Sequence, residues 1–380
     1  MFKVKNNESK GQKEQTAKND KYYYASQWSL MMRKFRKHKL AMVSTCVLLV
    51  LYFLAIFGNF ISPQGTEQFD GMYVNCPPTK VHLFHEGKLI GPFVYGLARE
   101  RDPETFMMSF VENKEEIYRI QFFVQGEEGG EYKFLGLFDT NLHLFEAEEG
   151  GKVFLFGTDD MGRDLFSRVL LGSQISLFIP VVGMLLTVFL GVLIGSLAGY
   201  IGGWVDTVIQ RIVEVVRSFP QVPLWMALSA AIPKTLKPAE VFMLMTLILS
   251  LISWPDLSRT IRSKFISIKK EDYIMAARIS GAPPSKIITR HMIPSFLSYI
   301  IVNMTMTIPN LIIGETTLSF LGLGLRSPAT SWGVLLQETN KLTTITFYPW
   351  KLIPMAFVFV AVLAFNFMGD GLRDAADPYK

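Results

Sequence analysis

The sequence predicts an all-α polytopic membrane protein with about six transmembrane helices and a β-rich extracytoplasmic insert between the first and second helices. The first observation is composition: of 380 residues, 49% are hydrophobic and 19% are charged, which is apolar-rich for a globular chain. The second is a series of long apolar runs, and the third is an acidic block between the first two runs. Together they favour a membrane chain over a soluble one.

Six runs approach the roughly 20 mostly apolar residues that a helix needs to cross a bilayer. The first run begins at Leu40, after a polar segment too long for a secretory leader, so we expect a retained helix. The third run is the least regular, because Arg211, Glu214, Arg217 and Pro220 interrupt it. The expected spans are Leu40–Ile61, Ile175–Tyr200, Val208–Ile232, Val241–Leu257, Ile293–Ile313 and Trp350–Met368.

The distribution of charge predicts the orientation in the membrane, because Lys and Arg accumulate on the cytoplasmic side. Residues 1–38 carry ten Lys or Arg against three acids, whereas residues 63–160 carry eight against eighteen. The loop after the fourth span is also basic, with eight Lys or Arg against Glu271 and Asp272. We therefore expect both termini and this loop in the cytoplasm, and 63–160 outside. With an apolar run between the basic and acidic blocks, we expect a lipid bilayer rather than nucleic acid as the partner.

These predictions divide the chain into four parts: a cytoplasmic segment 1–38, a transmembrane helix 39–62, an extracytoplasmic insert 63–160 and a transmembrane helical core 161–380. The insert contains four strand-like stretches separated by Gly-rich breaks, namely KVHLF, YRIQFFV, YKFLGLF and KVFLFG. We expect a small β-rich domain. The alternative is a solvated loop with two hairpins.

No catalytic or metal-binding motif is found in the sequence, which has no Walker A loop, HExxH or GxSxG. The two cysteines, Cys46 and Cys76, lie in different blocks and form no CxxC pair, so a disulfide is implausible and Cys76 is expected to be a buried thiol. We expect a chain that is not an enzyme and binds no cofactor itself.

The most informative stretch is residues 271–294, EDYIMAARISGAPPSKIITRHMIP, a polar segment between two apolar runs. Gly281 suits a left-handed helix end, and Pro284 suits the start of a second helix. A protein groove would accept the small-residue face of the first helix at close range, whereas a helix on lipid head groups would favour bulkier side chains. That face groups Tyr273, Ala276, Ala277 and Ser280.

The segment AARISGAPPSKIITRHMIP resembles the EAA loop of ABC importer permeases. Ala276, Ala277, Gly281 and Pro294 match its pattern, but Met275 stands where the general pattern has glutamate, and Glu271 lies four residues earlier. The resemblance is to the C-type permease subunit of the oligopeptide/dipeptide family and covers 28–62 and 157–380, without the insert. Other similar stretches are 28–42, 157–177, 199–220, 314–333 and 368–378.

The resemblance implies the type I ABC importer permease fold and a peptide-importing subunit in the bacterial cytoplasmic membrane. Residues 263–292, called loop 263–292 below, would couple to a cytoplasmic ATPase. The implied partners are a second permease subunit in a heterodimer, two ABC ATPases that bind ATP and Mg, and an extracytoplasmic peptide-binding protein. Cargo such as nickel chelates or sugars stays open, as does a non-transporting scaffold or sensor. The implied coupling residues are Glu271, Tyr273, Ala276, Ala277, Gly281 and Pro294.

Four further features leave alternatives open. The GxxxGxxxG pattern at 191–199 favours generic helix packing over a specific contact with the partner permease. The charges of the third run either face a cavity or partner, or lie on a cytoplasmic turn before a span that starts near Phe219. Glu315, placed after the fifth span, is expected to cap the next helix rather than meet a peptide amino terminus. The Gly-rich segment 318–333 is expected to be a re-entrant element.

Overall fold

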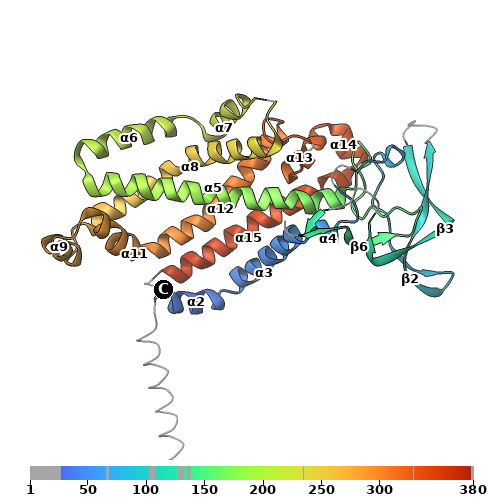
Figure 1. The fold of residues 1–380 in the computed structure, drawn as a ribbon, viewed down its shortest axis with the longest axis horizontal. Helices are drawn as coiled ribbons and strands as arrows, with labels where there is room; N and C mark the ends of the chain where they lie inside the picture. Colours follow the sequence, from blue (N-terminus) through green and yellow to red (C-terminus); the bar gives the residue numbers. More distant parts are fainter. Residues whose placement is uncertain are drawn as a thin grey trace, which may run out of the picture.

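The computed structural model describes residues 27–65, 68–101, 108–126, 132–134, 138–233, 235–327 and 329–377. It is an elongated helical bundle with a β-sheet at one end (Figure 1). We call that end the sheet end and the opposite end, where α9 lies, the loop end. Within the described residues, five helices are long and apolar enough to cross a membrane: α3 (Lys39–Ile56), α5 (Leu165–Ile201), α8 (Pro238–Ile268), α12 (Leu297–Phe320) and α15 (Ile353–Ala376, preceded by the short turn η4, Pro349–Leu352).

The third expected span is not one continuous apolar helix. It forms α6 (Gly203–Ser218) and α7 (Gln221–Ala230), separated at Phe219 and Pro220. A proline lacks the backbone N–H that would continue the helical hydrogen bonds. The charges of the third run lie on the helix α6 and not on a turn, and the break at Phe219 and Pro220 falls where the alternative span would begin. Arg211 and Glu214 form an exposed pair (Nη1–Oε2 2.7 Å), and Arg217 pairs with Asp256 of α8.

The packing of α5 on α8 shows why a return segment is needed between them. Gly183 of α5 lies against Ser250 of α8, and Gly199 lies against Phe265, so the contacts advance in the same direction along both helices. The two helices are therefore parallel. The chain must run back along their length before α8 begins, and Figure 1 shows α6 and α7 making this return beside them.

The observed helices extend beyond the apolar runs from which they were expected. α5 begins at Leu165 rather than near Ile175, α8 continues to Ile268, and α12 runs from Leu297 to Phe320. The first run forms α3 and the short α4 (Gly58–Ile61). An apolar run marks only the part of a helix that suits lipid, whereas these helix ends pack on loops and on the insert.

A helix that the sequence did not predict lies at the loop end. Helix α2 (Gln27–Lys37) places Met31 and Phe35 against Ala41 of α3 and Ala375 of α15. Lys34 Nζ donates to the backbone oxygen of Asp377 at 2.9 Å. The basic segment before the first span is therefore tied to the end of α15.

The insert contains an antiparallel sheet, so the expectation of strands is confirmed for the described part of 63–160. The four-stranded sheet has the order β1-β2-β3-β6, and β4 pairs with β5 in a separate hairpin. Val94, Phe145 and Val153 form its small buried core. The strands are β1 (His82–His85), β2 (Lys88–Arg101), β3 (Met108–Gln125), β4 (Tyr132–Phe134), β5 (Phe138–Thr140) and β6 (Leu142–Ala147), with a 3-10 turn η1 (Gly71–Tyr73) before them.

Two of the four predicted strands differ in the structure. The stretch YKFLGLF (132–138) is not a single strand, because its two ends belong to β4 and β5, which pair with each other. The stretch KVFLFG (152–157) has no strand partner. Instead, its Phe154 is buried and exchanges hydrogen bonds with Thr79, and the stretch ends at Gly157 with φ +75°. Its apolar side chains fill the junction between the sheet and α5 rather than a sheet face. Strand β2 was not predicted, because Gly91, Pro92 and Gly96 are typical breakers; the register shifts between Tyr95 and Gly96.

The segment after α12 folds back into the bundle at the sheet end. Trp332 is fully buried: its Nε1 donates to the Val169 oxygen of α5 at 3.1 Å, and its backbone N–H donates to Ser176 Oγ. This element is helical and begins only at the end of the stretch 318–333 that was expected to be re-entrant, so that expectation stays a prediction. It comprises α13 (Trp332–Gln337), η3 (Glu338–Asn340) and α14 (Leu342–Phe347).

Candidate functional site

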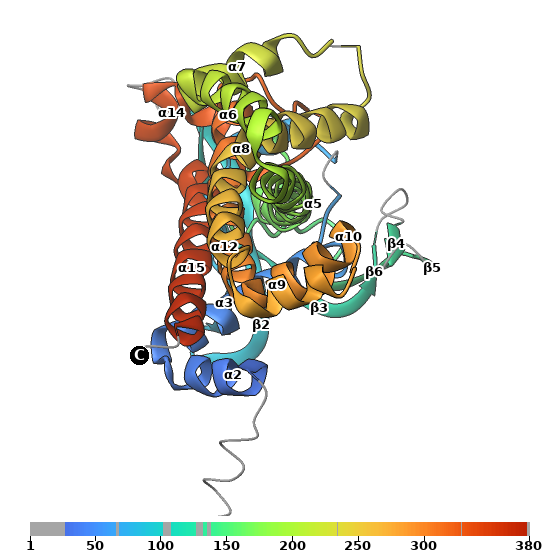
Figure 2. The same cartoon turned by 90° about the vertical axis from the view of Figure 1, so that its left-hand side faces the viewer.

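Loop 263–292 contains a helix, a sharp turn and a second helix at the loop end (Figures 1 and 2). The first helix, α9 (Asp272–Ile279), ends where Gly281 takes a φ of +78°. The Ala282 N–H donates to the Ala277 oxygen at 3.1 Å and the Gly281 N–H to the Arg278 oxygen at 3.0 Å. These two bonds close a helix around a left-handed residue. The predicted stop at Gly281 is confirmed.

The second helix begins at Pro284, as predicted. It consists of α10 (Pro284–Lys286), a π-helical turn η2 (Ile287–Met292) and α11 (Ile293–Ser295). An irregular residue, Phe296, separates it from α12. Pro294 therefore lies on this second helix and not at the start of the long span.

One buried isoleucine attaches α9 to the bundle. Ile274 is 2% exposed and packs in an apolar cluster with Phe265 of α8 and Ile287 of the second helix. Tyr200, at the end of α5, belongs to the same cluster, and the Arg278 guanidinium lies 5.9 Å from its ring centre. The position of α9 is thus set by the ends of α5 and α8.

The residues singled out from the sequence lie mostly on the outward side of the loop. Ala277 is the exception, because it is half-buried and packs against the apolar cluster around Ile274. Ile279 was not identified from the sequence, although it lies three residues after Ala276 and is 83% exposed. The remaining predicted residues are all exposed: Glu271, which precedes α9, Tyr273, Ala276, Gly281 and Pro294.

The glycine stripe of α5 lies against α8 of the same chain. An added Cβ at Gly191 would come within 2.9 Å of Leu257, and one at Gly195 within 2.5 Å of the Ser258 backbone oxygen. Real Cβ atoms do not approach so closely. The GxxxGxxxG pattern therefore serves close packing within the chain, the alternative that the sequence favoured.

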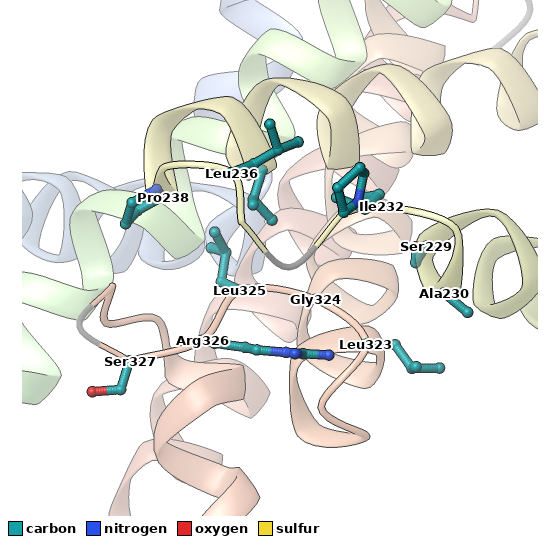
Figure 3. Close-up of a pocket in the computed structure, with 12 residues that line it drawn as sticks. Ser229, Ala230, Ile232, Leu236, Pro238, Leu323, Gly324, Leu325, Arg326 and Ser327 are labelled. Atoms are coloured by element: carbon teal, nitrogen blue, oxygen red, sulfur yellow. The ribbon is translucent and has the colours of Figure 1, made fainter.

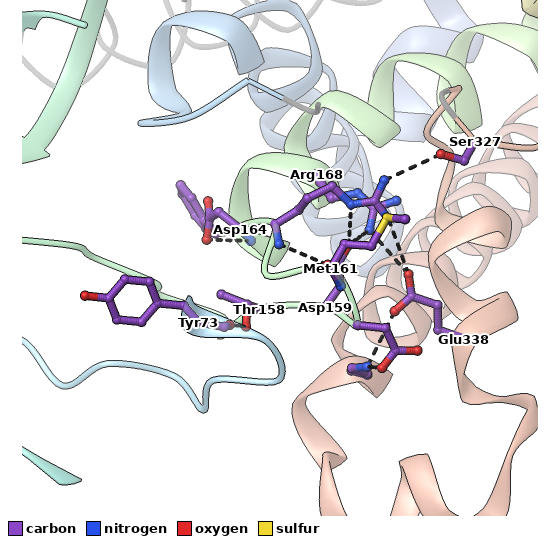
Figure 4. Close-up of polar contacts among 12 residues, drawn as sticks. Tyr73, Thr158, Asp159, Met161, Asp164, Arg168, Ser327 and Glu338 are labelled. Atoms are coloured by element: carbon purple, nitrogen blue, oxygen red, sulfur yellow. Dashed lines mark hydrogen bonds and ion pairs between the residues drawn. The ribbon is translucent and has the colours of Figure 1, made fainter. Parts of the chain in front are cut away.

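A cluster of charged side chains is buried at the sheet end (Figure 4). Arg168 of α5 is 2% exposed and donates to Asp159, which is 1% exposed; Arg163 Nε reaches the same carboxylate at 2.6 Å. Glu338 of η3 lies 3.5 Å from both Arg168 and Lys351, and Lys351 also pairs with Asp160. Below, "ion cluster" means Asp159, Asp160, Arg163, Arg168, Glu338 and Lys351.

The ion cluster joins three segments that are far apart in the sequence: the turn before α5, η3, and η4 at the start of α15. Three acids face three bases, so the formal charges balance. Buried charges are tolerated when they are paired in this way. The sequence motif GTDDMGRDLFSR contains four of the six members of the ion cluster, but nothing in it indicates Glu338 or Lys351.

Burial changes the acidity of two carboxyls at this end. Asp164 caps α5, accepting the Ser167 N–H at 2.8 Å, and burial raises its pKa to about 6 although these hydrogen bonds oppose the change. Burial also raises the pKa of Glu338, with Asp159 adding to the effect and Arg168 and Lys351 opposing it. The neutral and charged forms of both groups are therefore closer in free energy than in water.

Glu315 does not cap the helix after the fifth expected span. It lies inside α12, is fully buried, and its Oε1 accepts hydrogen bonds from Ser319 Oγ and Ser331 Oγ, each at 2.8 Å. Ser331 itself caps α13. The prediction is wrong because α12 continues past the apolar run, and the carboxyl instead connects α12 to the segment that folds back.

A hollow of about 500 Å³ lies between the α7–α8 connection and residues 323–327, which follow α12. Figure 3 shows the α7–α8 connection facing residues 323–327 across it, with Arg326 lying along the opening.

In the described parts of the chain no group of three or more His, Cys, Asp or Glu is arranged to hold a metal ion. Both cysteines are free, and burial raises the pKa of Cys76 to about 12, as expected of an unreactive thiol.

Comparison with known proteins gives the family. Residues 191–379 match the family described as binding-protein-dependent transport system inner membrane component, and residues 26–78 match the N-terminal TM domain of oligopeptide transport permease C. The oligopeptide transport system permease protein OppC of Bacillus subtilis (strain 168) is 36% identical over 240 residues, 63% of this chain and 76% of the relative. This chain belongs to the binding-protein-dependent transport permeases.

The resemblance to C-type permeases drawn from the sequence is thereby confirmed. The OppC protein of Escherichia coli (strain K12) agrees, with 39% identity over 224 residues, 59% of the permease and 72% of the relative. The family is one of membrane transport components and not of catalysts. Neither family match includes residues 79–190, which contain the whole described sheet of the permease.

Proposed function

We propose that the permease is a transmembrane subunit of an ATP-driven importer for oligopeptides or dipeptides and forms half of the translocation pathway. The observation that carries this proposal is its identity of 36–39% to permeases named for oligopeptide transport, over most of their length. The helical bundle and the exposed turn of loop 263–292 fit this role.

The parallel packing of α5 and α8 supports a topology of six crossings. A parallel pair requires an odd number of crossings between its members, and α6 with α7 is the one return segment available. Their 28 residues, 203–230, reach about 42 Å at 1.5 Å per residue, enough for a bilayer core of about 30 Å. The basic helix α2 then lies in the cytoplasm of a bacterium, at the same end of the bundle as loop 263–292, and the sheet lies outside the inner membrane.

The outward face of α9 is the proposed contact for a cytoplasmic ATPase. Tyr273 is 46% exposed and Ile279 83% exposed, with Ala276 between them on the surface. An apolar ring and an isoleucine around an alanine form a shallow surface that a groove in a partner can cover. Since Ile274 holds α9 to the bundle, force on α9 would act on the ends of α5 and α8.

The partners follow from the same role. A second permease subunit supplies the other half of the pathway, two ATPases bind ATP and Mg, and an extracytoplasmic binding protein delivers the peptide. The permease supplies no nucleotide site of its own. The insert 63–160 would support the binding protein at the pathway mouth, because its sheet lies at the sheet end of the bundle (Figure 1).

Reconstitution tests the proposal. The complete complex in proteoliposomes should take up a labelled oligopeptide only when ATP, both ATPases and the binding protein are present, and the purified permease should not hydrolyse ATP. Uptake of a sugar or a nickel chelate in place of peptide would contradict the proposed peptide cargo. Uptake without the ATPases would contradict the proposed ATP-driven mechanism.

The topology has a separate test in cells. In a Cys46→Ala background, Lys88→Cys on the exposed start of β2 should react with an impermeant thiol reagent in intact cells, and Lys286→Cys on α10 only after the cells are opened. Labelling of Lys286→Cys in intact cells would contradict the orientation.

A further inference from the structure

A basic hollow of about 500 Å³ lies at the loop end, where α5 and α8 finish and α9 begins. Figures 1 and 2 show α9 beside the ends of these two helices. Three lining side chains are cationic: Lys269 and Lys270 at the end of α8, and Arg278 on α9. The remaining lining residues carry no charge and are Gly199, Gly202, Ile266 and Met275. Below, the basic hollow means these seven residues.

Two of the cations converge on one aromatic ring. The Lys269 Nζ lies 5.5 Å and the Arg278 guanidinium 5.9 Å from the ring centre of Tyr200, the next-to-last residue of α5. Lys269 Nζ also donates to the Tyr200 backbone oxygen at 2.6 Å, which uses one of its three N–H groups. The ring and the carbonyl thus hold two positive charges near each other at the end of α5, although like charges repel.

No acid in the described part of the chain forms a salt bridge with these three cations. Asp206 of α6 is already paired, because the Arg262 guanidinium donates to both of its oxygens. Glu271 and Asp272 follow Lys270 in the sequence, but both are exposed at the start of α9 and form no salt bridge with the described residues. The basic hollow therefore has an excess of positive charge, which an anion from outside the chain would stabilise.

The basic hollow lies at the depth where lipid head groups meet the protein. The apolar run of α5 ends with the exposed Ile201, and Trp204, the second residue of α6, is 77% exposed. Ile266, in the lining itself, is also exposed. Tryptophan is enriched at the interface between membrane and water, and exposed isoleucines suit the lipid tails next to it. The anion most available at this depth is the phosphate of a phospholipid.

The flank of α9 that lines the basic hollow is not the face proposed for the ATPase. Met275 and Arg278 line the hollow, whereas Tyr273, Ala276 and Ile279 form the outward face. A lipid can therefore occupy the hollow while an ATPase covers the outward face. The three cations favour an anionic lipid, because its phosphate accepts hydrogen bonds from several cations at once, whereas a choline or ethanolamine head group adds another positive charge.

We propose that the basic hollow binds the phosphate of an anionic phospholipid, such as phosphatidylglycerol, and that this lipid holds α9 against the end of α8. The inference does not depend on the peptide cargo and requires only that the loop end lies at a membrane surface. The phosphate binds Lys269 and Lys270 from the end of α8 and Arg278 from α9, as basic pockets at the cytoplasmic ends of membrane helices bind anionic head groups. One lipid thereby adds a polar contact to the apolar cluster around Ile274.

The first experiment measures lipid binding to the full permease chain in neutral detergent by native mass spectrometry. Phosphatidylglycerol should bind the wild type, and Lys270→Gln with Arg278→Gln should lower its affinity about tenfold or more, as should a change of the lipid to phosphatidylcholine. The control, Lys286→Gln with Arg290→Gln, removes the same charge from exposed positions outside the hollow and should bind like the wild type. All four side chains are exposed, so both variants should fold. Failure of the wild type to bind, equal losses in the two variants, or displacement of the lipid by inorganic phosphate alone would overturn the assignment.

The second experiment locates the lipid in the complete complex. Phosphatidylglycerol with a photoreactive head group should label residues 266–278 of the permease while both ATPases are bound. Labelling that is seen in the isolated permease and disappears in the complex would show that an ATPase occupies the hollow, and labelling only elsewhere would also overturn the assignment. A wild-type complex that takes up no peptide would remove the proposed function while lipid binding persists, so the two failures are distinguishable.

Discussion

The two ends of the bundle differ in what they bury and what they leave exposed. At the sheet end the centre of the ion cluster is buried, with Arg168 2% exposed and Asp159 1% exposed, and its charges are paired inside the chain. At the loop end α9 is held by the buried Ile274, while Tyr273, Ala276 and Ile279 face outward without a covering layer from the described chain.

This difference separates a structural region from a contact region. Charges paired within the chain fix the relative positions of α5, η3 and α15, and a substitution there should change folding. A small outward face on a firmly attached helix contributes little to folding, and a substitution there should change assembly. Four predictions test this division, in descending order of effect.

Ala276→Glu should abolish uptake by releasing the ATPases, since a charge would be buried at the proposed contact. The free energy of unfolding of the permease in detergent should stay within about 0.5 kcal/mol of that of the wild type, as for other exposed positions. Co-purification of ATPase with tagged permease is the measurement. Ser285→Ala, beyond the turn, is the matched control and should transport normally. Full ATPase association in Ala276→Glu would mean that α9 is not the contact.

Arg168→Met should destabilise the permease by about 3–5 kcal/mol, because it leaves Asp159 buried without its main partner. Denaturant unfolding in detergent measures the change. Arg211→Met removes an exposed pair with Glu214 and should change stability by no more than about 1 kcal/mol. Equal losses of stability in the two variants would contradict the claim that the buried charges contribute more to folding than the exposed ones.

Asp164→Asn should change the pH dependence of stability. The folded pKa of Asp164 is about 6, above its ordinary value of 3.8, so its protonation favours the folded state at low pH. That contribution is fully present below pH 3.8 and is lost as the pH rises through 6, a change of about 2–3 kcal/mol.

The asparagine variant lacks this change. Its unfolding midpoint relative to wild type should therefore rise between pH 5 and pH 8, whatever constant loss the altered cap causes. A difference between the two proteins that does not vary with pH would show that the carboxyl stays ionised in the fold.

Gly281→Ala should lower the free energy of unfolding by about 1 kcal/mol, because a Cβ is unfavourable at a φ of +78°. No heavy atom lies within 4 Å of that added Cβ, so the penalty comes from the backbone alone. Thermal unfolding measures it. Gly71→Ala, which also meets nothing within 4 Å and has an ordinary φ, is the control. A loss several times larger at Gly281 would point to a contact that the backbone argument omits.

Local patterns predicted the parts of the permease whose structure depends on neighbouring residues. The helix stop at Gly281 and the helix start at Pro284 follow from backbone preferences and were correct. Local patterns were less successful in the insert. Strand β2 was missed because the breaker Pro92 is tolerated within it, and KVFLFG was wrongly predicted as a strand because it packs between two parts of the chain instead of pairing.

Long-range features could not be predicted in this way. Glu315 was expected to cap a helix because α12 was assumed to end with its apolar run. In the structure it is buried and accepts a hydrogen bond from Ser331 of the segment that folds back. Ala277 was expected to share one outward face with Ala276, but the apolar cluster around Ile274 covers part of its side chain. Each outcome depends on a segment that no local pattern identifies.

Apolar length and charge asymmetry were sufficient to predict a membrane chain, and Gly281 and Pro284 to predict a turn in loop 263–292, because these signals depend on composition and on backbone preferences within a few residues. The permease family was indicated by the resemblance of the EAA-like segment. The tertiary structure was needed to show that α5 and α8 are parallel and that Glu338 and Lys351 complete the ion cluster. The physical reason is that burial and pairing are properties of packed segments, and a residue's position in the sequence does not indicate which distant segment will cover it.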